Sequence, residues 1–202
     1  MDTNSEKNPL YTLVELLFMP MAFYVLTQLS KVDSLQKGVG WFIVFIMVQN
    51  EYFSIKDSSP KYNIRLYLSD IWSIFMYWFA LNAVTKSNPV IGYDPLFWIY
   101  LSGIWFGYAI WDWVMIYHEE SSHKKEDYRR WRNNMFICFI ITLLCGVALL
   151  SIQPTAQPNI YVLCVLQLLP LGCVFWALVG WWLRSFLAKH RTKQSRTTPD
   201  VV

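Results

Sequence analysis

Four carboxylate side chains lie inside long apolar stretches of this sequence. Glu15, Glu51, Asp70 and Asp112 each occupy a different stretch, in a chain whose residues are 55% hydrophobic and only 15% charged. An acid inside hydrocarbon is costly, by roughly 2.5 to 3.5 kcal/mol at the centre of a spanning helix. Such a residue therefore either pairs with another polar group and holds helices together, or exchanges protons or cations.

The stretches that carry these acids are long enough to be membrane-spanning helices. A window of about 20 apolar residues predicts spans over residues 10–29, 38–55, 64–85, 95–117, 133–152 and 160–183. Because the intervening loops are short, we expect one all-α domain over residues 1–188, a compact bundle of about six transmembrane helices. Residues 189–202 mix basic and small polar side chains, which predicts a disordered basic tail.

The distribution of lysine and arginine predicts the orientation of these spans. Of the 17 lysines and arginines, only Lys31, Lys37 and Lys86 fall in the first, third and fifth loops. All the others lie at the termini, at the ends of spans, or in the second and fourth loops. Basic loops stay in the cytoplasm, so both termini are expected there, in the plasma (inner) membrane if the protein is bacterial.

This orientation puts the four acids at one depth, near the cytoplasmic ends of their spans. At 1.5 Å per residue they lie roughly 6 to 9 Å inside the boundary, and Arg65 and Arg184 lie at the same level. In a structural interpretation, the acids pair with these arginines or with Lys56 and fix the helix packing. In a functional interpretation, the clustered acids respond to protons, cations or the state of the membrane.

Gly103 and Gly107 form a pair of small residues one turn apart in the fourth span. Such a pair lets two helix backbones approach closely, which predicts contact with another helix of this chain or of a second copy. Asp112 lies nine residues beyond Gly103 and therefore on the opposite face of the helix.

Residues 118–132 are strongly charged, and they predict a helical extension of the fourth span that projects into the cytoplasm. Glu119, Glu120 and Glu126 each stand four residues before a histidine or a basic residue, a spacing that stabilises helices. This surface is either solvated or binds a cytosolic protein or anionic lipid headgroups. Its candidate residues are His118, Glu119, Glu120, His123, Lys124, Lys125, Arg129, Arg130 and Arg132.

The sequence predicts no catalytic or metal site. His118 and His123 are five residues apart, whereas a zinc protease motif needs a spacing of four to bring both imidazoles to one metal. The four cysteines lie in the last two spans, where thiols usually behave as small apolar groups. We therefore expect a protein that is not an enzyme, has no cofactor or metal, and does not bind nucleic acid directly.

The first span also carries a family resemblance. It opens on Glu15, Leu16, Leu17 and Phe18 and closes on Thr27, Gln28, Leu29 and Ser30. This pattern resembles the first helix of the low temperature requirement A family of bacterial membrane proteins. The resemblance covers one helix of six, Met19 stands where that family has a further aspartate, and no activity is implied by it.

These features together predict a non-enzymatic multi-pass membrane subunit. We expect a sensor or anchor that self-associates and recruits a cytosolic protein through residues 118–132. The middles of the spans offer little polar lining, unlike the substrate sites of most transporters. The alternative is a small proton- or cation-coupled transporter, or an oligomeric channel, that uses the same four carboxylates.

Overall fold

The computed structural model describes residues 9–58, 63–152 and 159–197. For residues 54–58 and 181–197 it describes the backbone alone, and for the others it describes the side chains as well. Within these ranges the chain is helical and contains no strand. The elements are α1 (Pro9–Gln28), the short 3-10 helix η1 (Leu29–Lys31), α2 (Leu35–Ser58), α3 (Ile64–Thr85), α4 (Leu96–His118), α5 (Ser122–Ser151) and α6 (Ile160–Thr197).

Within the described residues, four segments are long and apolar enough to cross a membrane: Pro9–Lys31, Leu96–His118, Ser122–Ser151 and Ile160–Gly180. Large apolar side chains are also exposed around the helices, among them Phe23, Leu144 and Phe175. Both observations are typical of a protein in contact with lipid, and they confirm the prediction of an all-helical membrane protein. The helices α2 and α3 have the length of a span but a less apolar composition.

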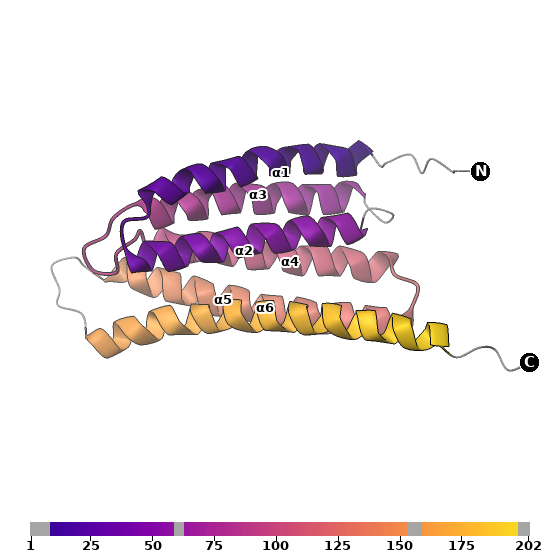
Figure 1. Ribbon diagram of the computed structural model, residues 1–202. Coiled ribbons are helices and arrows are strands. Elements are labelled where there is room, and N and C mark those ends of the chain that lie inside the picture. Colours follow the sequence, from indigo (N-terminus) through magenta and orange to yellow (C-terminus); the bar gives the residue numbers. More distant parts are fainter. Residues whose placement is uncertain (1–8, 59–62, 153–158, 198–202) are drawn as a thin grey trace, which may run out of the picture.

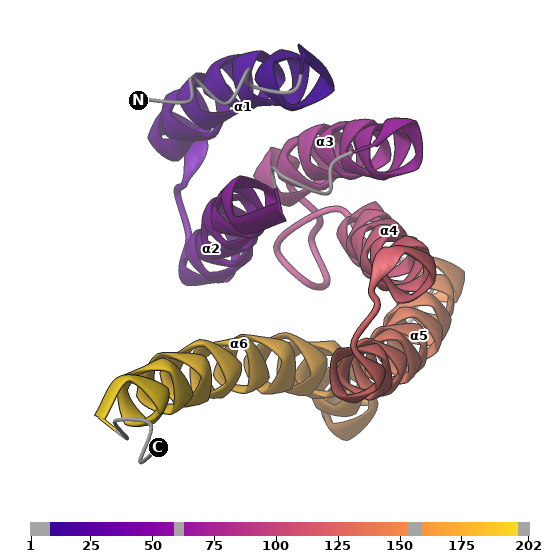
Figure 2. The same ribbon diagram turned by 90° about the vertical axis from the view of Figure 1, so that its right-hand side faces the viewer.

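The helices lie side by side and run up and down, so that α1 begins and α6 ends at the same end of the array (Figure 1). Viewed along their axes, they form an arc (Figure 2). Within this arc α3 packs on α4, and α4 packs on α5. The helices α1 and α2 cover α3 at one end of the arc, and α6 packs on α5 at the other.

The contact between α3 and α4 depends on Gly103 and Gly107. A Cβ atom added at Gly103 would lie 2.6 Å from the sulfur of Met76, and one added at Gly107 would lie 2.9 Å from Oγ of Ser73. The close approach exposes two carbonyl groups of α4 to α3. Ser69 donates a hydrogen bond of 2.9 Å to the Gly107 carbonyl, and the indole N–H of Trp72 donates one of 2.8 Å to that of Gly103. The glycine pair therefore faces α3 of the same chain.

The charged segment that follows α4 differs from the prediction. The chain leaves the helix after His118, and Glu119 has an extended backbone with ψ 133°. The buried carboxylate of Glu119 accepts the backbone N–H groups of Glu120 and Ser121, at 3.2 and 3.3 Å. These local bonds compete with helix continuation. The prediction of a helical extension of the fourth span is therefore wrong, because the charged residues form the first turns of α5, which lies back along α4 (Figure 1).

The last helix is also longer than expected. It continues to Thr197, so it includes residues 189–197 of the segment that was predicted to be disordered. The reason is compositional, because no proline or glycine occurs between residues 181 and 197, where leucine, lysine, arginine and glutamine favour a helix. The division of the chain into a helical domain and a basic tail stays a prediction. Residues 198–202 of the predicted tail lie outside the described residues.

Candidate functional site

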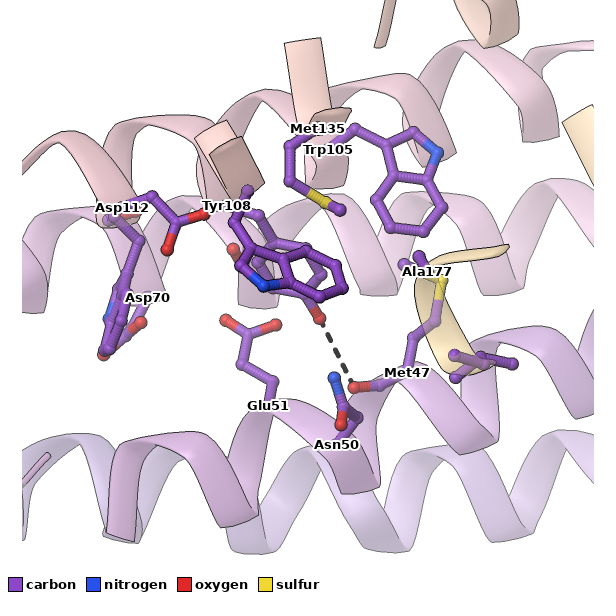
Figure 3. A pocket seen from close by; sticks show the side chains of 14 residues that line it. Met47, Asn50, Glu51, Asp70, Trp105, Tyr108, Asp112, Met135 and Ala177 are labelled. Carbon is purple, nitrogen blue, oxygen red and sulfur yellow. Dashed lines mark hydrogen bonds between the residues drawn. The ribbon is translucent and has the colours of Figure 1, made fainter. Parts of the chain in front are cut away.

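A cavity of about 120 Å³ lies among the helices α2, α3, α4, α5 and α6. Much of its lining comes from positions one turn apart on a helix, such as Met47 and Glu51 on α2 or Trp105, Tyr108 and Asp112 on α4. Because one water needs roughly 10 to 15 Å³ of such space, the cavity has room for several waters or for a small polar group. Figure 3 shows these side chains converging from the surrounding helices.

Three of the four predicted acids line this cavity. Glu51 comes from α2, Asp70 from α3 and Asp112 from α4, and their exposed fractions are only 4%, 1% and 8%. The fourth acid does not take part, because Glu15 on α1 accepts a hydrogen bond of 3.3 Å from the hydroxyl of Tyr52. Of the four acids that were expected to form one layer, Glu51, Asp70 and Asp112 share a cavity, and Glu15 lies apart from them.

Glu51 is the least satisfied of these acids. Its carboxyl group points from α2 toward Tyr108 (Figure 3), and neither of its buried oxygens has a hydrogen-bond partner among the described residues. The hydroxyls of Ser73, Tyr77 and Tyr108 lie close enough to stabilise this carboxyl group, although none reaches it with good hydrogen-bond geometry, and the carboxyl group of Asp70 is a further charged neighbour. A carboxylate that is buried without a partner is strongly disfavoured, so this site attracts a proton or a cation.

The two tyrosines near Glu51 have other acceptors for their protons. The hydroxyl of Tyr108 donates a long hydrogen bond of 3.5 Å to the carbonyl of Met47, drawn as the dashed line in Figure 3. The hydroxyls of Tyr77 and Tyr108 are hydrogen bonded to each other. If Tyr108 donates to Met47, then Tyr77 donates to Tyr108, and neither phenol has a proton left for Glu51.

Aromatic rings form much of the remaining lining. Trp105, Tyr108 and Trp111 of α4 and Trp131 of α5 all border the cavity. The ring centroids of Trp105 and Tyr108 are 5.9 Å apart, with an angle of 66° between the ring planes. Gly180 of α6 makes room for Trp131, because a Cβ atom added there would lie 2.4 Å from the indole ring.

The predicted cationic partners do not lie in the described part of this site. Arg65 is exposed and borders a different groove, with Trp72 and Tyr117. The described residues that line the cavity include no lysine, arginine or histidine. The side chains of Lys56 and Arg184 lie outside the described residues. A pairing of the acids with Arg184 therefore stays a prediction.

The predicted cytoplasmic surface begins α5 and is internally paired. Arg130 lies 3.4 Å from the carboxylate of Glu126, with Arg129 at 3.8 Å, and His123 lies 3.3 Å from Asp127. The predicted pairs of Glu119 with His123 and of Glu120 with Lys124 do not form within a helix, because both acids precede α5. The candidate residues Lys124, Lys125 and Arg132 lie on α5 itself, and His118 is the last residue of α4.

A second polar cluster lies at the opposite end of the array, and it was not predicted from the sequence. Lys37, only 3% exposed, contacts Asp33 at 3.0 Å and Ser87 at 2.9 Å. The hydrogen bond from Lys37 holds the pKa of the Asp33 carboxyl group below its ordinary value. This cluster joins the start of α2 to the segment that follows α3.

The aromatic lining was not predicted from the sequence, although its spacing was visible there. Trp105, Tyr108 and Asp112 follow one another at intervals of three and four residues, which places them on one face of a helix. In a chain that is 18% aromatic, this pattern did not stand out.

No known protein family, curated protein or solved structure matches this chain. The resemblance of the first span to the low temperature requirement A family therefore stays an expectation.

Proposed function

We propose that this chain is a non-enzymatic multi-pass membrane subunit that senses a cation through the cavity lined by Glu51, Asp70 and Asp112. The observation that carries the proposal is the carboxyl group of Glu51, which is 4% exposed and has no hydrogen-bond partner among the described residues. An ionised carboxyl group that is buried in this way is costly, and two further acids line the same cavity. Binding of a positive charge relieves this cost and favours the helix arrangement that encloses it.

The signal would leave the cavity through α5. Trp131 and Met135 line the cavity, and the charged residues 122–132 belong to the same helix. A change in cavity occupancy that moves these side chains would therefore move the charged surface. We propose that this surface binds a cytosolic protein or anionic lipid headgroups, and that the subunit self-associates in the membrane.

We also propose the finer topology, with six spans and both termini in the cytoplasm. The biased distribution of lysine and arginine supports this orientation. The lengths of α2 and α3 support two further spans, because each is long enough to cross a bilayer. In this orientation the cavity opens near the cytoplasmic side.

The transport alternative has weaker support. Transport requires that a polar path continue from the cavity toward the other face. Beyond the cavity, the facing parts of α3 and α4 bury apolar side chains such as Leu81, Trp98 and Leu101. Their close packing favours sensing over passage.

The test measures amide hydrogen exchange in the first turns of α5. The full-length protein is kept in detergent micelles, and the kind and concentration of cation in the buffer are changed. The protection of the amides of residues 122–132 against hydrogen exchange, after correction for the intrinsic pH dependence of exchange, is expected to rise as protons, alkali metal ions or ammonium ions are added, since cavity occupancy fixes Trp131. Glu51→Gln is expected to abolish this response. Without added cation it is also expected to raise the free energy of unfolding by about 1 kcal/mol or more, because the carboxylate that is buried without a hydrogen-bond partner is removed.

Glu15→Gln is the matched control, because Glu15 belongs to the same predicted layer but lies outside the cavity. This variant is expected to keep the response of the unmodified protein. The proposal is contradicted if no cation changes the exchange of residues 122–132, or if Glu51→Gln responds as the unmodified protein does. Cation flux into proteoliposomes that disappears in Asp112→Asn would favour the transport alternative instead.

A further inference from the structure

The cavity combines acids with aromatic rings, and this combination narrows the kind of cation that fits it. We propose that the ligand is an organic ammonium group, held by the carboxyl group of Glu51 and enclosed by Trp105, Tyr108 and Trp111. This inference rests on the proposed function, since it names the class of cation that the cavity senses.

The lining is unsuited to a metal ion. Calcium and magnesium take six or more oxygen ligands at about 2.0 to 2.6 Å. Among the residues described in the structure, no group of three or more histidines, cysteines and acids has an arrangement that holds a metal. The walls next to Glu51 are instead built from tryptophan, tyrosine and methionine side chains.

An alkylammonium group needs a different environment, and this cavity supplies it. Such a cation is attracted to the faces of tryptophan and tyrosine rings, and it carries apolar methyl or methylene groups that gain from burial. The rings of Trp105 and Tyr108 meet at 66°, so they form two walls at an angle to each other. Glu51 enters from α2, on the other side of the cavity from α4 (Figure 3).

The carboxyl group of Glu51 supplies the counter-charge. It is buried, it points into the cavity, and its two oxygens accept no hydrogen bond from any described residue. A quaternary ammonium group donates no hydrogen bond, so it pairs with such a carboxylate through charge alone. A primary ammonium group would add up to three hydrogen bonds.

The same chemistry has two sources near a membrane. One is the choline or ethanolamine headgroup of a phospholipid, and the other is a soluble alkylammonium compound. In the proposed topology the cavity lies near the level of the inner headgroups, so both sources reach it. The arms of the experiment separate them.

The first arm uses the full-length protein in maltoside micelles, which contain no ammonium group. Choline is titrated against its neutral isostere 3,3-dimethylbutan-1-ol, and binding is read from tryptophan fluorescence and from the thermal unfolding midpoint. Choline is expected to bind saturably and at least about 10-fold more tightly than the isostere, since only choline carries the charge. Equal binding of the two compounds would overturn the proposal.

The variants test the residues named in the proposal. Glu51→Gln is expected to abolish the preference for choline over the isostere. Trp111→Leu, at a half-buried position, is expected to weaken choline binding about 10-fold. Trp113→Leu is the matched control on the same helix, because Trp113 is 52% exposed and does not line the cavity. Choline binding that survives in Glu51→Gln, or that weakens equally in both tryptophan variants, would overturn the proposal.

The second arm identifies the source. The protein is placed in nanodiscs of phosphatidylcholine, phosphatidylethanolamine or phosphatidylglycerol, and the choline titration is repeated. If a headgroup is the ligand, phosphatidylcholine is expected to occupy the site and abolish the response to soluble choline, whereas phosphatidylglycerol preserves it. If the ligand is soluble, the response persists in every lipid. Both results support an ammonium site.

The two proposals fail separately. A response to protons or alkali metal ions that depends on Glu51, with no preference for choline over its isostere, overturns the ammonium assignment and leaves cation sensing intact. The absence of any response that depends on Glu51, to any cation, overturns both.

Discussion

Glu51 is the central residue of the proposed site, and it differs from Glu15 in the hydrogen bonds that its carboxyl group receives. Glu15 receives a hydrogen bond from Tyr52, whereas neither oxygen of Glu51 receives one from the described residues. The hydroxyls of Tyr77 and Tyr108, which lie near Glu51, are hydrogen bonded to each other, and Tyr108 also donates to the carbonyl of Met47. A group left in this state is a common mark of a binding site, because a ligand can supply the missing partner.

Asp33 shows the opposite condition, an exposed acid whose ionised form is stabilised. The hydrogen bond from Lys37 lowers its pKa below the ordinary value of 3.8. A lowered pKa means that the bond stabilises the fold above about pH 4 and that this contribution is lost as the pH falls through the lowered pKa.

We therefore expect Asp33→Asn to unfold more readily than the unmodified protein at neutral pH and to approach it in acid. Thermal unfolding midpoints measured from pH 7 down to pH 2 would check this. The substitution also removes the charged partner of buried Lys37, which keeps its hydrogen bond to Ser87. A difference between the two proteins that grows as the pH falls would contradict the assignment.

At the scale of the helices, glycines decide how closely the elements approach. Gly146 of α5 faces α4, where an added Cβ atom would lie 3.1 Å from the backbone nitrogen of Ile99 and 3.2 Å from Cβ of Trp98. Neither neighbour is the far end of a flexible side chain, so the helices themselves would have to separate. Gly172 of α6 has no neighbour among the described residues within 4 Å of such an atom.

These two glycines give a matched pair of substitutions. Gly146→Ala is expected to lower the free energy of unfolding by about 1 to 3 kcal/mol, because the contact between α4 and α5 becomes overpacked. Gly172→Ala is expected to raise it by about 0.5 to 1 kcal/mol, because alanine favours a helix over glycine. Denaturation of both variants in micelles would measure the difference, and equal effects would show that the packing of α5 on α4 is looser than described.

At the scale of the whole molecule, the up-and-down order of the helices determines at which end of the array the charged start of α5 lies relative to the cavity. The segment between α4 and α5 lies at the end of the array where α1 begins and α6 ends (Figure 1). The cluster of Lys37, Asp33 and Ser87 belongs to connections at the other end. In the proposed orientation, the sensing cavity and its charged surface therefore serve the same side of the membrane.

Two exposed lysines test this orientation. In a background with all four cysteines replaced, a membrane-impermeant maleimide applied to whole cells is expected to label Lys31→Cys. It is expected to label Lys124→Cys only after the membrane has been permeabilised, because basic loops remain in the cytoplasm. Labelling of both positions in intact cells, or of Lys124→Cys alone, would contradict the proposed topology.

The sequence by itself determined the class of this protein and much of its helix pattern, because long apolar stretches have few alternatives to a helix in a membrane. The predicted third span, residues 64–85, coincides with α3 (Ile64–Thr85). The end of α4 was harder to predict, because the side chain of Glu119 accepts hydrogen bonds from the backbone N–H groups of Glu120 and Ser121 and so interrupts a segment whose composition favours a helix.

Only the tertiary structure decided which residues form the site. Position along a span gives depth, so the sequence could align four acids, but it could not show that Glu15 faces Tyr52 while Glu51, Asp70 and Asp112 share a cavity. Their facing depends on the rotation of each helix about its own axis, and packing with neighbouring helices sets that rotation. The meeting of acids with aromatic rings depends on the same packing, since it joins side chains from helices far apart in the chain.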